Sequence, residues 1–447
     1  MNSLNNPLDN QLNDASFASL WEELEWRGCI KETTNVAGSL EKALENEKLT
    51  YYCGFDPTAP SLHLGNFVQL MLMRRLQLAG HKPLALVGGS TGLIGDPKPG
   101  AERNLNTKET VAEWVEYLGS QISKYLDFSG ENRAKLVNNL DWTENFEVID
   151  FLRDIGKYFR VGKMIKKDAV ATRLNSELGI SYTEFSYQIL QGYDFLQLYK
   201  KYDCTLQTGG SDQWGNFVSG IDLIRSVTSE ENPQSDSPVE VHAIGTPLIT
   251  NADGTKFGKS EGNAIWLDEN LTSPYEMYQF WINTADADVI DRLKVFTFLT
   301  RAEIEELAEA VEKEPFKREA QKRLAYEVTS LIHGVDKTEQ AIEASGALFG
   351  RGDLTSLDEQ TLLSSLSQLE FKSINRDELT ATNILVKSGH AKGTSEARRI
   401  IKEGGAYINN EKITSHDATL SREQLLHDKY LVVRKGKKNL AALKISD

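Results

Sequence analysis

Cysteine is scarce in this chain of 447 residues, which contains only Cys29, Cys53 and Cys204. The three are widely separated, without the dense pattern of a disulfide-stabilised secreted domain or the paired spacing of a zinc site. Hydrophobic runs are also short, and none approaches the ~20 residues that a membrane-spanning helix needs. The polar, Asn-rich residues 1–17 lack the basic and apolar regions of a secretory signal. We therefore expect a cytoplasmic protein with no membrane association.

The sequence also lacks a Gly-x-Gly-x-x-Gly motif, so a nicotinamide or flavin site has no support. Positive charge is in deficit, and the net charge of −15 argues against indiscriminate binding to nucleic acids. The charge is uneven, however, because residues 379–447 contain 13 Lys and Arg against 7 Asp and Glu. A small basic module on an acidic body indicates a specific nucleic-acid contact. Chance variation in surface charge remains the alternative.

A strand–helix–strand unit is visible near the N-terminus. Aromatic-rich residues 49–55 predict a buried strand. Residues 64–79 predict an apolar helix closed by Gly80, and residues 83–87 predict a second strand. This order implies a parallel sheet, in which ligands bind at the carboxyl ends of the strands. The residues expected near that edge are Tyr52, His63, Gly88 and Gly89.

A second α/β unit follows the first. Its expected elements are a helix at 182–202, a strand at 204–208, a turn at 209–215, a helix at 216–227 and a strand at 241–248. Helical character then continues from residue 275 to about residue 346 without a convincing strand. The chain is too long for one hydrophobic core, so we expect two or three domains.

Two short stretches carry groups that suit a polyphosphate. Residues 63–66 (HLGN) place an imidazole at the start of an apolar helix, where backbone donors favour an anion. Residues 256–260 (KFGKS) follow a Gly-containing turn and carry two ammonium groups and a hydroxyl. Each stretch alone is more often a solvated surface. Together, in this order, they indicate a nucleotidyl-transfer enzyme.

One expected helix also has the character of a binding-site wall. Tyr187, Gln191 and Asp194 stand at positions i, i+4 and i+7, hence on one face. The same helix is rich in apolar side chains such as Phe185 and Leu196. The combination predicts that the polar face lines a site, and a solvated polar face is the alternative.

Five strings of the sequence carry a family resemblance: YCGFDPTAPSLHLGN (52–66), GGSTGLIGDP (88–97), FSYQILQGYD (185–194), GGSDQWG (209–215) and KFGKS (256–260). They resemble the class I aminoacyl-tRNA synthetases, and within them the bacterial tyrosyl-tRNA synthetases. The resemblance runs from about residue 24 to the C-terminus. It implies an enzyme that activates L-tyrosine with ATP and Mg²⁺ to tyrosyl-adenylate and then esterifies the terminal adenosine of tRNA(Tyr). It also implies a homodimer without a tightly bound cofactor or a protein-held metal.

The resemblance, together with the pattern of elements, divides the chain into five parts. They are a polar extension (1–20), a doubly wound, Rossmann-like α/β catalytic domain (21–273), an all-α anticodon-side domain (274–346), a linker (347–378) and a small α+β RNA-binding domain (379–447).

The resemblance further implies roles for single residues. For the phosphates of ATP it implies Thr58, His63, Asn66, Arg103, Lys256 and Lys259, with Lys98 as a further candidate. Asn66 stands where the family often has a second His, so a neutral donor replaces a cation. For the rest of ATP it implies Cys53, Gly54, Gly65, Asp212 and Ser260. For tyrosine it implies Tyr187, Gln191 and Asp96 at the ammonium, Asp194 and Tyr52 at the phenolic hydroxyl, and Gln213 at the carboxylate.

The basic C-terminal segment resembles a small RNA-binding module shared with a small-subunit ribosomal protein. Ser395 is expected to cap a helix that ends at Gly404-Gly405 and is followed by a hairpin. Arg398, Arg399 and Lys402 of this helix are expected to meet RNA phosphates. A solvated basic helix is the alternative.

Two rival functions remain open from the sequence. One is a tryptophan-specific relative on the same scaffold, against which Asp194 and Tyr52 favour a phenol over an indole. The other is a non-catalytic RNA-binding protein that kept the fold, against which His63, Lys256 and Lys259 argue.

Overall fold

The computed structural model describes residues 8, 11–97, 104–177, 179–235, 237–252, 254, 257–260, 263–348, 352–367, 369–436 and 439–446. The chain forms two compact units, one of residues 1–271 with 284–324 and the other of residues 272–283 with 325–447. No helix in these described ranges has the length and apolar character needed to cross a membrane.

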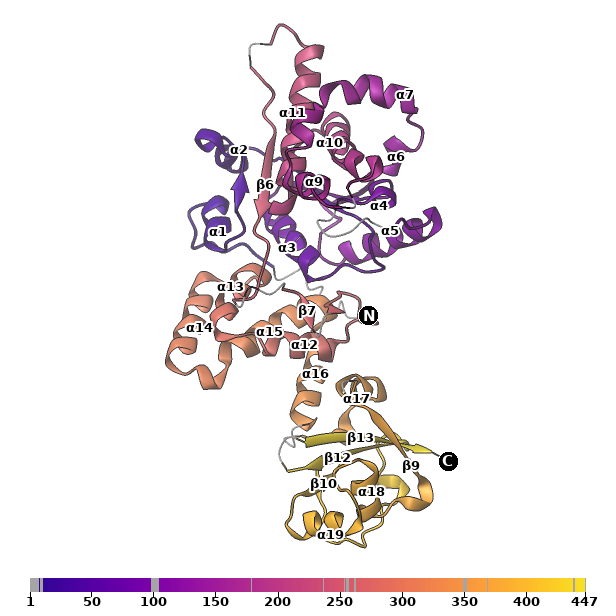
Figure 1. Ribbon diagram of the computed structural model, residues 1–447. Coiled ribbons are helices and arrows are strands. Elements are labelled where there is room, and N and C mark those ends of the chain that lie inside the picture. Colours follow the sequence, from indigo (N-terminus) through magenta and orange to yellow (C-terminus); the bar gives the residue numbers. More distant parts are fainter. Residues whose placement is uncertain are drawn as a thin grey trace. The chain divides into compact units, whose positions relative to one another are not determined.

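A six-stranded sheet forms the centre of the first unit (Figure 1). Its strands are β1 (Glu32–Thr33), β2 (Thr50–Phe55), β3 (Lys82–Val87), β4 (Lys135–Asn138), β5 (Cys204–Gly210) and β6 (His242–Thr246), in the order β1-β6-β5-β2-β3-β4. Only β1 is antiparallel to its neighbour. The chain moves outward from β2 to β4 and returns to β5 on the other side of β2, which confirms the expected doubly wound fold. Folds of this class bind ligands outside the carboxyl ends of the strands where the strand order switches, which here is between β2 and β5.

The sequence predicted β2, β3, β5 and β6 but missed the edge strand β4. Two of the four residues of β4 are exposed, so the segment has no apolar run to mark it. Its pairing with β3, from Leu84–Lys135 to Val87–Asn138, defines it as a strand. The consequence is functional, because Asn138 and Asn139 arrive at the same carboxyl edge as the residues that follow β2 and β3.

Helices surround this sheet. They are α1 (Leu20–Trp26), α2 (Ser39–Asn46), α3 (Leu64–Leu78), α4 (Thr91–Ile94), α5 (Lys108–Ile122), α6 (Leu140–Thr143), α7 (Val148–Asp150), α8 (Val161–Met164), α9 (Asp168–Leu174), α10 (Tyr182–Tyr202) and α11 (Trp214–Glu231). The same unit contains α13 (Asp286–Phe296), which packs against α3, and α14 (Arg301–Lys313), which packs against α13. Gly80 follows α3 with φ of 94°, as expected for a residue that ends a helix. Helices α10 and α11 lie side by side (Figure 1). Gly192 and Gly220 face each other here, and they also leave room for aromatic rings, since a Cβ on Gly192 would lie 3.0 Å from Phe159 and one on Gly220 would lie 3.2 Å from Phe195.

The N-terminal polar extension contributes to this unit before α1 begins. The guanidinium of Arg74, near the end of α3, donates to Gln11 Oε1 at 2.9 Å and to the Leu8 carbonyl at 3.1 Å. Asn13 donates to the Arg75 carbonyl at 2.9 Å, which satisfies an acceptor in the last turn of α3. The described part of the extension therefore supports the C-terminal end of the helix that starts at His63.

The segment from 274 to 348 is helical, as predicted. Besides α13 and α14 it contains α12 (Pro274–Ile282), α15 (Glu319–His333) and α16 (Val335–Leu348). Ser273 and Glu276 form a capping box at α12, and Thr300 and Glu303 form another at α14. No strand occurs between residues 272 and 348, all of which are described within the stretch 263–348.

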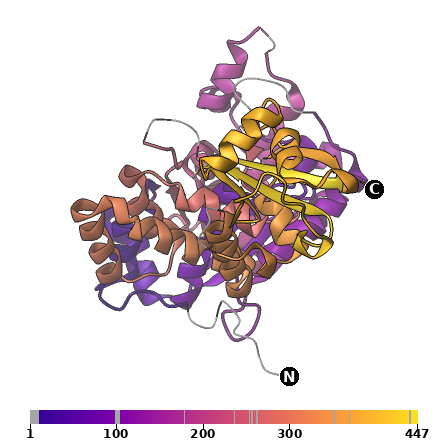
Figure 2. The ribbon, with the colours of Figure 1, turned by 90° about the horizontal axis from the view of Figure 1, so that it is seen from below.

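A mixed five-stranded sheet belongs to the second unit. Its strands are β9 (Phe371–Asn375), β10 (Ala406–Ile408), β11 (Glu411–Lys412), β12 (Tyr430–Lys435) and β13 (Asn439–Ser446), in the order β11-β10-β12-β13-β9. Helices α18 (Ala381–Lys387) and α19 (Thr394–Lys402) share the hydrophobic core of this sheet. In Figure 2 the strands of this sheet are the yellow arrows, seen with the orange helices.

Two local expectations for this region differ from the structure. The stretch 347–378, expected as a linker, contains α17 (Glu359–Ser365) and β9, which pairs in parallel with β13. Its weak periodicity hid an edge strand that depends on a distant partner. The N-cap of α19 is Gly393 rather than Ser395, and Glu396 accepts a hydrogen bond from the Lys392 amide at 2.9 Å instead. The predicted hairpin is confirmed by the pairing of β10 with β11.

Candidate functional site

A hydrogen-bonded cluster lies at the carboxyl edge of the first sheet, where β2 and β3 end. Asp56, directly after β2, accepts hydrogen bonds from the Tyr187 hydroxyl and from Thr91 Oγ1, each at 2.7 Å. Gly88, directly after β3, must lack a side chain, because a Cβ there would lie 2.1 Å from Asp56 Oδ1. Burial raises the pKa of Tyr187 well above its usual value, and the Asp56 and Asp96 carboxylates raise it further. Tyr187 is therefore a neutral hydrogen-bonding group between two acids.

A second cluster joins three predicted residues from different elements. Asn216 Nδ2 donates to Gln191 Oε1 and to Gln213 Oε1, each at 2.9 Å, and lies 3.4 Å from Asp96 Oδ1. Gln213 Nε2 also donates to Asp96 Oδ2 at 3.0 Å. One carboxylate and several amide oxygens and nitrogens in one place suit the ammonium and carboxylate of an amino acid.

Lys167 adds a positive charge to this cluster. Its Nζ donates to Asn216 Oδ1 at 3.3 Å, and its aliphatic stem would be 3.2 Å from a Cβ on Gly215. Burial lowers the pKa of Lys167 to about 8, while Asp96 and Asp222 oppose that shift. Gly215 of the GGSDQWG string thus leaves room for Lys167, which the sequence analysis did not predict as its neighbour.

Asp194 lies at the apolar end of the site and is 1% exposed. It accepts hydrogen bonds from Asn139 Nδ2 at 2.9 Å and from Trp142 Nε1 at 2.8 Å. Burial raises the pKa of Asp194 to about 7, although those two hydrogen bonds act in the opposite direction. The Tyr52 hydroxyl donates to Gln207 Oε1 at 3.1 Å. Burial, and secondarily the Asp194 carboxyl, raise the pKa of Tyr52 well above its usual value.

Sequence reasoning missed several residues of these clusters, namely Asp56, Thr91, Asn139, Trp142, Lys167, Gln207 and Asn216. Asn139 joins Asp194 to the Asp56 cluster, because its Nδ2 lies 2.9 Å from both Thr91 Oγ1 and Asp194 Oδ2. Asp56 and Asn216 stand within or directly after the strings already singled out, so their position was a usable signal. Asn139 follows β4 and had no such signal.

His63 forms the N-cap of α3. Its Nδ1 accepts from the amides of Gly65 at 3.0 Å and Asn66 at 3.3 Å, while Asn66 Oδ1 accepts from the His63 amide at 3.1 Å. A neutral imidazole that accepts at Nδ1 carries its proton on Nε2, which is therefore a donor. Gly65 is needed for this arrangement, since a Cβ there would lie 2.8 Å from the imidazole. Thr58 and His63 are both exposed.

The structure brings the start of α3 next to the segment that follows the KFGKS string. The Leu64 amide donates to the Ile265 carbonyl at 3.1 Å, and the Leu267 amide donates to the Leu62 carbonyl at 2.8 Å. Lys259 and Ser260 form strand β7 (Lys259–Ser260), which pairs with β8 (Asn263–Ala264). The two stretches, distant in sequence, are thus neighbours. Lys98, Arg103 and Lys256 lie outside the described residues, as do the side chains of Lys259 and Ser260.

The remaining expected ATP residues lie on the same edge. Cys53 is buried, and burial raises its pKa to about 12, so it stays a neutral thiol. Gly54 and Asp212 are exposed. Within the described ranges no three His, Cys, Asp or Glu residues are grouped as ligands for a metal ion.

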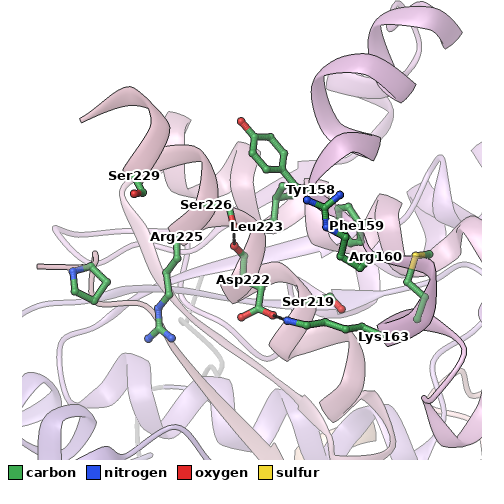
Figure 3. Close-up of a pocket in the computed structure, with 12 residues that line it drawn as sticks. Tyr158, Phe159, Arg160, Lys163, Ser219, Asp222, Leu223, Arg225, Ser226 and Ser229 are labelled. Atoms are coloured by element: carbon green, nitrogen blue, oxygen red, sulfur yellow. Dashed lines mark hydrogen bonds and ion pairs between the residues drawn. The ribbon is translucent and has the colours of Figure 1, made fainter. Parts of the chain in front are cut away.

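A pocket of about 570 Å³ lies between α8 and α11 (Figure 3). Arg160 and Lys163 line one side, and Asp222 and Arg225 of α11 line the other. Lys163 pairs with Asp222 at 3.4 Å, whereas neither arginine forms an ion pair with any described residue. Three serines of α11 complete the polar lining: Ser219, Ser226 and Ser229.

The predicted RNA contact on α19 is a solvent-facing helix surface. Arg398, Arg399 and Lys402 are exposed, while Ile400 and Ile401 are buried against the sheet. Arg399 lies 4.0 Å from Glu396 and 3.9 Å from Glu403, so its charge is partly balanced.

Comparisons with known proteins agree with this geometry. Residues 44–350 match the family described as "tRNA synthetases class I (W and Y)", and residues 362–443 match the "Tyrosine--tRNA ligase SYY-like C-terminal domain". The tyrosine–tRNA ligase of Leifsonia xyli subsp. xyli is 59% identical over 438 residues, which cover 98% of this chain and 96% of that protein. The tyrosine–tRNA ligase of Streptomyces avermitilis is 56% identical over 425 residues, which cover 95% and 98%.

A solved structure is also similar. The C-terminally truncated mitochondrial tyrosyl-tRNA synthetase of Coccidioides posadasii has a TM-score of 0.63 and 35% identity, covering 73% of this chain and 92% of that one. The full-length relatives named above carry the name tyrosine–tRNA ligase, which supports tyrosine–tRNA ligation over the tryptophan-specific and non-catalytic alternatives. The chain belongs to the tyrosine–tRNA ligases, the tyrosine branch of the class I aminoacyl-tRNA synthetases.

Proposed function

We propose the following roles for individual residues in tyrosine–tRNA ligation. The observation that supports the proposal is the pairing of two unlike ends in one site. A buried carboxyl beside Tyr52 lies at one end, and the cluster of Asp96, Gln191 and Gln213 lies at the other. The first end suits a phenolic hydroxyl, and the second suits an amino acid's ammonium and carboxylate. ATP–pyrophosphate exchange with tyrosine, tryptophan and phenylalanine tests this, and exchange that prefers either of the other two would contradict it.

In the proposed first step the tyrosine carboxylate attacks the α-phosphate of ATP and pyrophosphate leaves. The substrate is the nucleophile, so the protein supplies position and charge rather than a covalent group. His63 Nε2 and Thr58 would donate to the departing phosphates from the start of α3. Lys256, Lys259 and Arg103 would add cations, and Asn66 would add a neutral contact while it caps His63.

Magnesium is proposed to enter with ATP. The triphosphate oxygens are themselves ligands for Mg²⁺, which usually keeps several waters and needs few protein carboxylates. Cys53, Gly54 and Gly65 would contact the nucleoside, with Asp212 at the ribose and Ser260 beside Lys259. No tightly bound cofactor is proposed.

For tRNA we propose two contacts. The first is the pocket of Figure 3, where Arg160 and Arg225 offer charges to RNA phosphates. Helix α11 connects it with the amino-acid site, since Asn216 and Arg225 are nine residues apart and hence about 14 Å along the axis. The second contact is α19, with Arg398, Arg399 and Lys402.

The double variant Arg160→Ala/Arg225→Ala is expected to raise the KM for tRNA about tenfold and to leave ATP–pyrophosphate exchange unchanged. Each lost phosphate contact should also reduce the slope of log affinity against log salt by about 0.7–0.9. The triple variant Arg398→Ala/Arg399→Ala/Lys402→Ala should behave in the same way. Charging assays over a salt series measure both effects, and an unchanged slope would remove the corresponding surface from the proposal.

We further propose a cytoplasmic homodimer. Ten of the eighteen large apolar side chains exposed in the described ranges lie between Leu105 and Tyr182, with Val148, Ile149 and Tyr182 at 71%, 70% and 68% exposure. Val148 and Ile149 are adjacent and both largely exposed, which supports an apolar protein–protein contact in this region. We propose that a second copy of this chain binds over these exposed apolar side chains. Apart from the expected linker 347–378, which contains α17 and β9, the five-part division of the chain also stays a prediction.

Asp194→Asn is expected to lower kcat/KM for tyrosine about 10–100-fold and to change that for phenylalanine little. Above its pKa of about 7, Asp194 is a charged acceptor, and such an acceptor for a buried hydroxyl is worth about 1.5–3 kcal/mol. Phenylalanine has no hydroxyl to use it, so the assay is run above that pKa. Tyrosyl-tRNA synthetases are themselves the standard example of such discrimination. Steady-state exchange with both amino acids measures the ratio, and equal losses would show that Asp194 only supports the fold.

The same variant should change the pH dependence of stability. The pKa of Asp194 is about 7 in the folded chain against 3.8 in the unfolded chain, so ionisation is more favourable after unfolding. The contribution of the protonated group is full below pH 4 and is lost as the pH rises toward 7. Asp194→Asn should remove a decline of up to about 1.4 kcal/mol per pH unit in that window. Urea titrations between pH 4 and 8 measure it, and identical slopes would contradict the raised pKa.

A further inference from the structure

Arg292 of α13 holds both sides of the turn that leads into the KFGKS string. The side chain is 6% exposed. Its Nη2 donates to the Thr250 carbonyl at 2.6 Å, before the turn. Its guanidinium carbon lies 4.8 Å from the centre of the Phe257 ring, after the turn. One planar cation therefore contacts main chain and aromatic ring at two points seven residues apart.

Neighbouring side chains on the same face of α13 complete this contact. Asp288 and Phe296 stand four residues before and after Arg292, hence on one face of the helix. Asp288 Oδ2 accepts from the Ala252 amide at 3.2 Å, and Asp288 Oδ1 lies 3.4 Å from Arg292. The Phe296 ring centre lies 5.5 Å from that of Phe257. The Phe257 ring thus has Arg292 and Phe296 as neighbours.

Backbone hydrogen bonds connect Phe257 with the start of α3, where the phosphates are proposed to bind. Gly258, the next residue, has φ of 78°, a conformation that a side chain would strain. Its carbonyl accepts from the Ile265 amide at 2.9 Å, and the Ile265 carbonyl accepts from the Leu64 amide at 3.1 Å. A continuous series of contacts therefore runs from Arg292 through Phe257 to the residue after His63.

Burying a guanidinium is costly, and burial lowers the pKa of Arg292 from its usual value, while Asp288 and Asp291 oppose that shift. A leucine or methionine would fill the same space without that cost. An arginine is favoured where a planar cation must both stack on a ring and donate to a carbonyl.

We propose that Arg292 is a positioning residue for adenylate formation, which sets the main chain leading into Lys259 by holding Phe257 and Thr250. The inference rests on the proposed action of the loop lysines on pyrophosphate. A displacement of about 1 Å in a group that acts on the leaving phosphate costs as much as 100-fold in rate. In this proposal Arg292 acts through Thr250 and Phe257 and needs no contact with ATP or tyrosine.

Arg292→Met keeps an aliphatic stem of similar length and removes the planar, charged guanidinium group. Tyrosyl-adenylate formation, measured in single turnovers at saturating ATP and tyrosine, should slow about 10–100-fold. The dissociation constant of tyrosine, and the transfer of tyrosine from preformed adenylate to tRNA, should change less than about twofold. Arg292→Lys should recover part of the rate, because an ammonium still reaches the ring.

Lys294→Met is the matched control. Lys294 lies on the same helix, and its Nζ is 4.8 Å from the Trp26 ring, so the variant removes a cation–ring contact away from the turn. It should form adenylate at the normal rate. Equal losses in Lys294→Met and Arg292→Met, or equal losses in both reaction steps of Arg292→Met, would show a merely structural role.

The Lys259→Ala variant separates this inference from the proposed function. A normal rate of adenylate formation in Lys259→Ala would overturn the action of the loop on pyrophosphate. A slow Lys259→Ala with a normal Arg292→Met would overturn only the role of Arg292. When both changes are combined, Arg292→Met should cost less than it does alone, since the lysine that it positions is absent.

Discussion

Lys259→Ala is expected to form tyrosyl-adenylate roughly two to four orders of magnitude more slowly than the unmodified chain. Negative charge develops on pyrophosphate only as it departs. A cation directed there therefore stabilises the transition state more than it stabilises the complex with bound tyrosine. The main chain supports this placement, since a Cβ on the preceding Gly258 would lie 3.5 Å from Leu64 Cβ at the start of α3. Single-turnover activation measured by quenched flow gives the rate.

The affinity for tyrosine should remain nearly unchanged in this variant. Equilibrium binding of tyrosine without ATP therefore serves as its control. A loss confined to tyrosine binding, or an unaltered activation rate, would show that Lys259 does not act on the leaving group.

His63→Ala should slow adenylate formation by about two to three orders of magnitude, the usual effect of removing one transition-state donor. It should also lower the free energy of unfolding by about 0.5–2 kcal/mol, because Nδ1 no longer caps the amides of Gly65 and Asn66. Quenched-flow kinetics and urea unfolding measure the two effects separately.

His63→Asn separates the two roles of the imidazole. Asparagine is a good N-cap residue, so the free energy of unfolding should return close to that of the unmodified chain. The rate should stay low, because the short amide does not extend a donor to the place of Nε2. If His63→Asn restores the rate together with the stability, the imidazole acts only as a cap.

The site shows how far local sequence reaches. Tyr187, Gln191 and Asp194 were predicted to share a helix face because α10 keeps its period over Tyr182–Tyr202, and Ser181 caps its start. Their partners were not predictable in this way. Tyr187 bonds to Asp56, 131 positions earlier, and Asp194 bonds to Asn139, 55 positions earlier. A hydrogen bond between distant segments leaves no periodic signal in either of them.

Edge strands show the same limit in the fold. Apolar composition predicts the buried strands β2 and β3, but β4 and β9 are short and largely exposed. Such segments become strands only when a neighbour offers its free backbone groups, as β3 does for β4 and β13 does for β9. The stretch 347–378 was expected to be a linker, but its strand β9 belongs to the C-terminal sheet.

By itself the sequence determined the doubly wound α/β class, the helical segment after residue 273, the long helices and the two stretches, 63–66 and 256–260, that are proposed to act on the phosphates. These features depend on side-chain periodicity and on turn and cap residues, which act over a few positions. Only the tertiary structure decided that Asn139 joins Asp194 to the Asp56 cluster, that Lys167 joins the Asn216 cluster and that Arg292 holds Phe257. Those contacts join segments far apart in the chain, and they form because burial requires each polar group to find a partner wherever the fold places one.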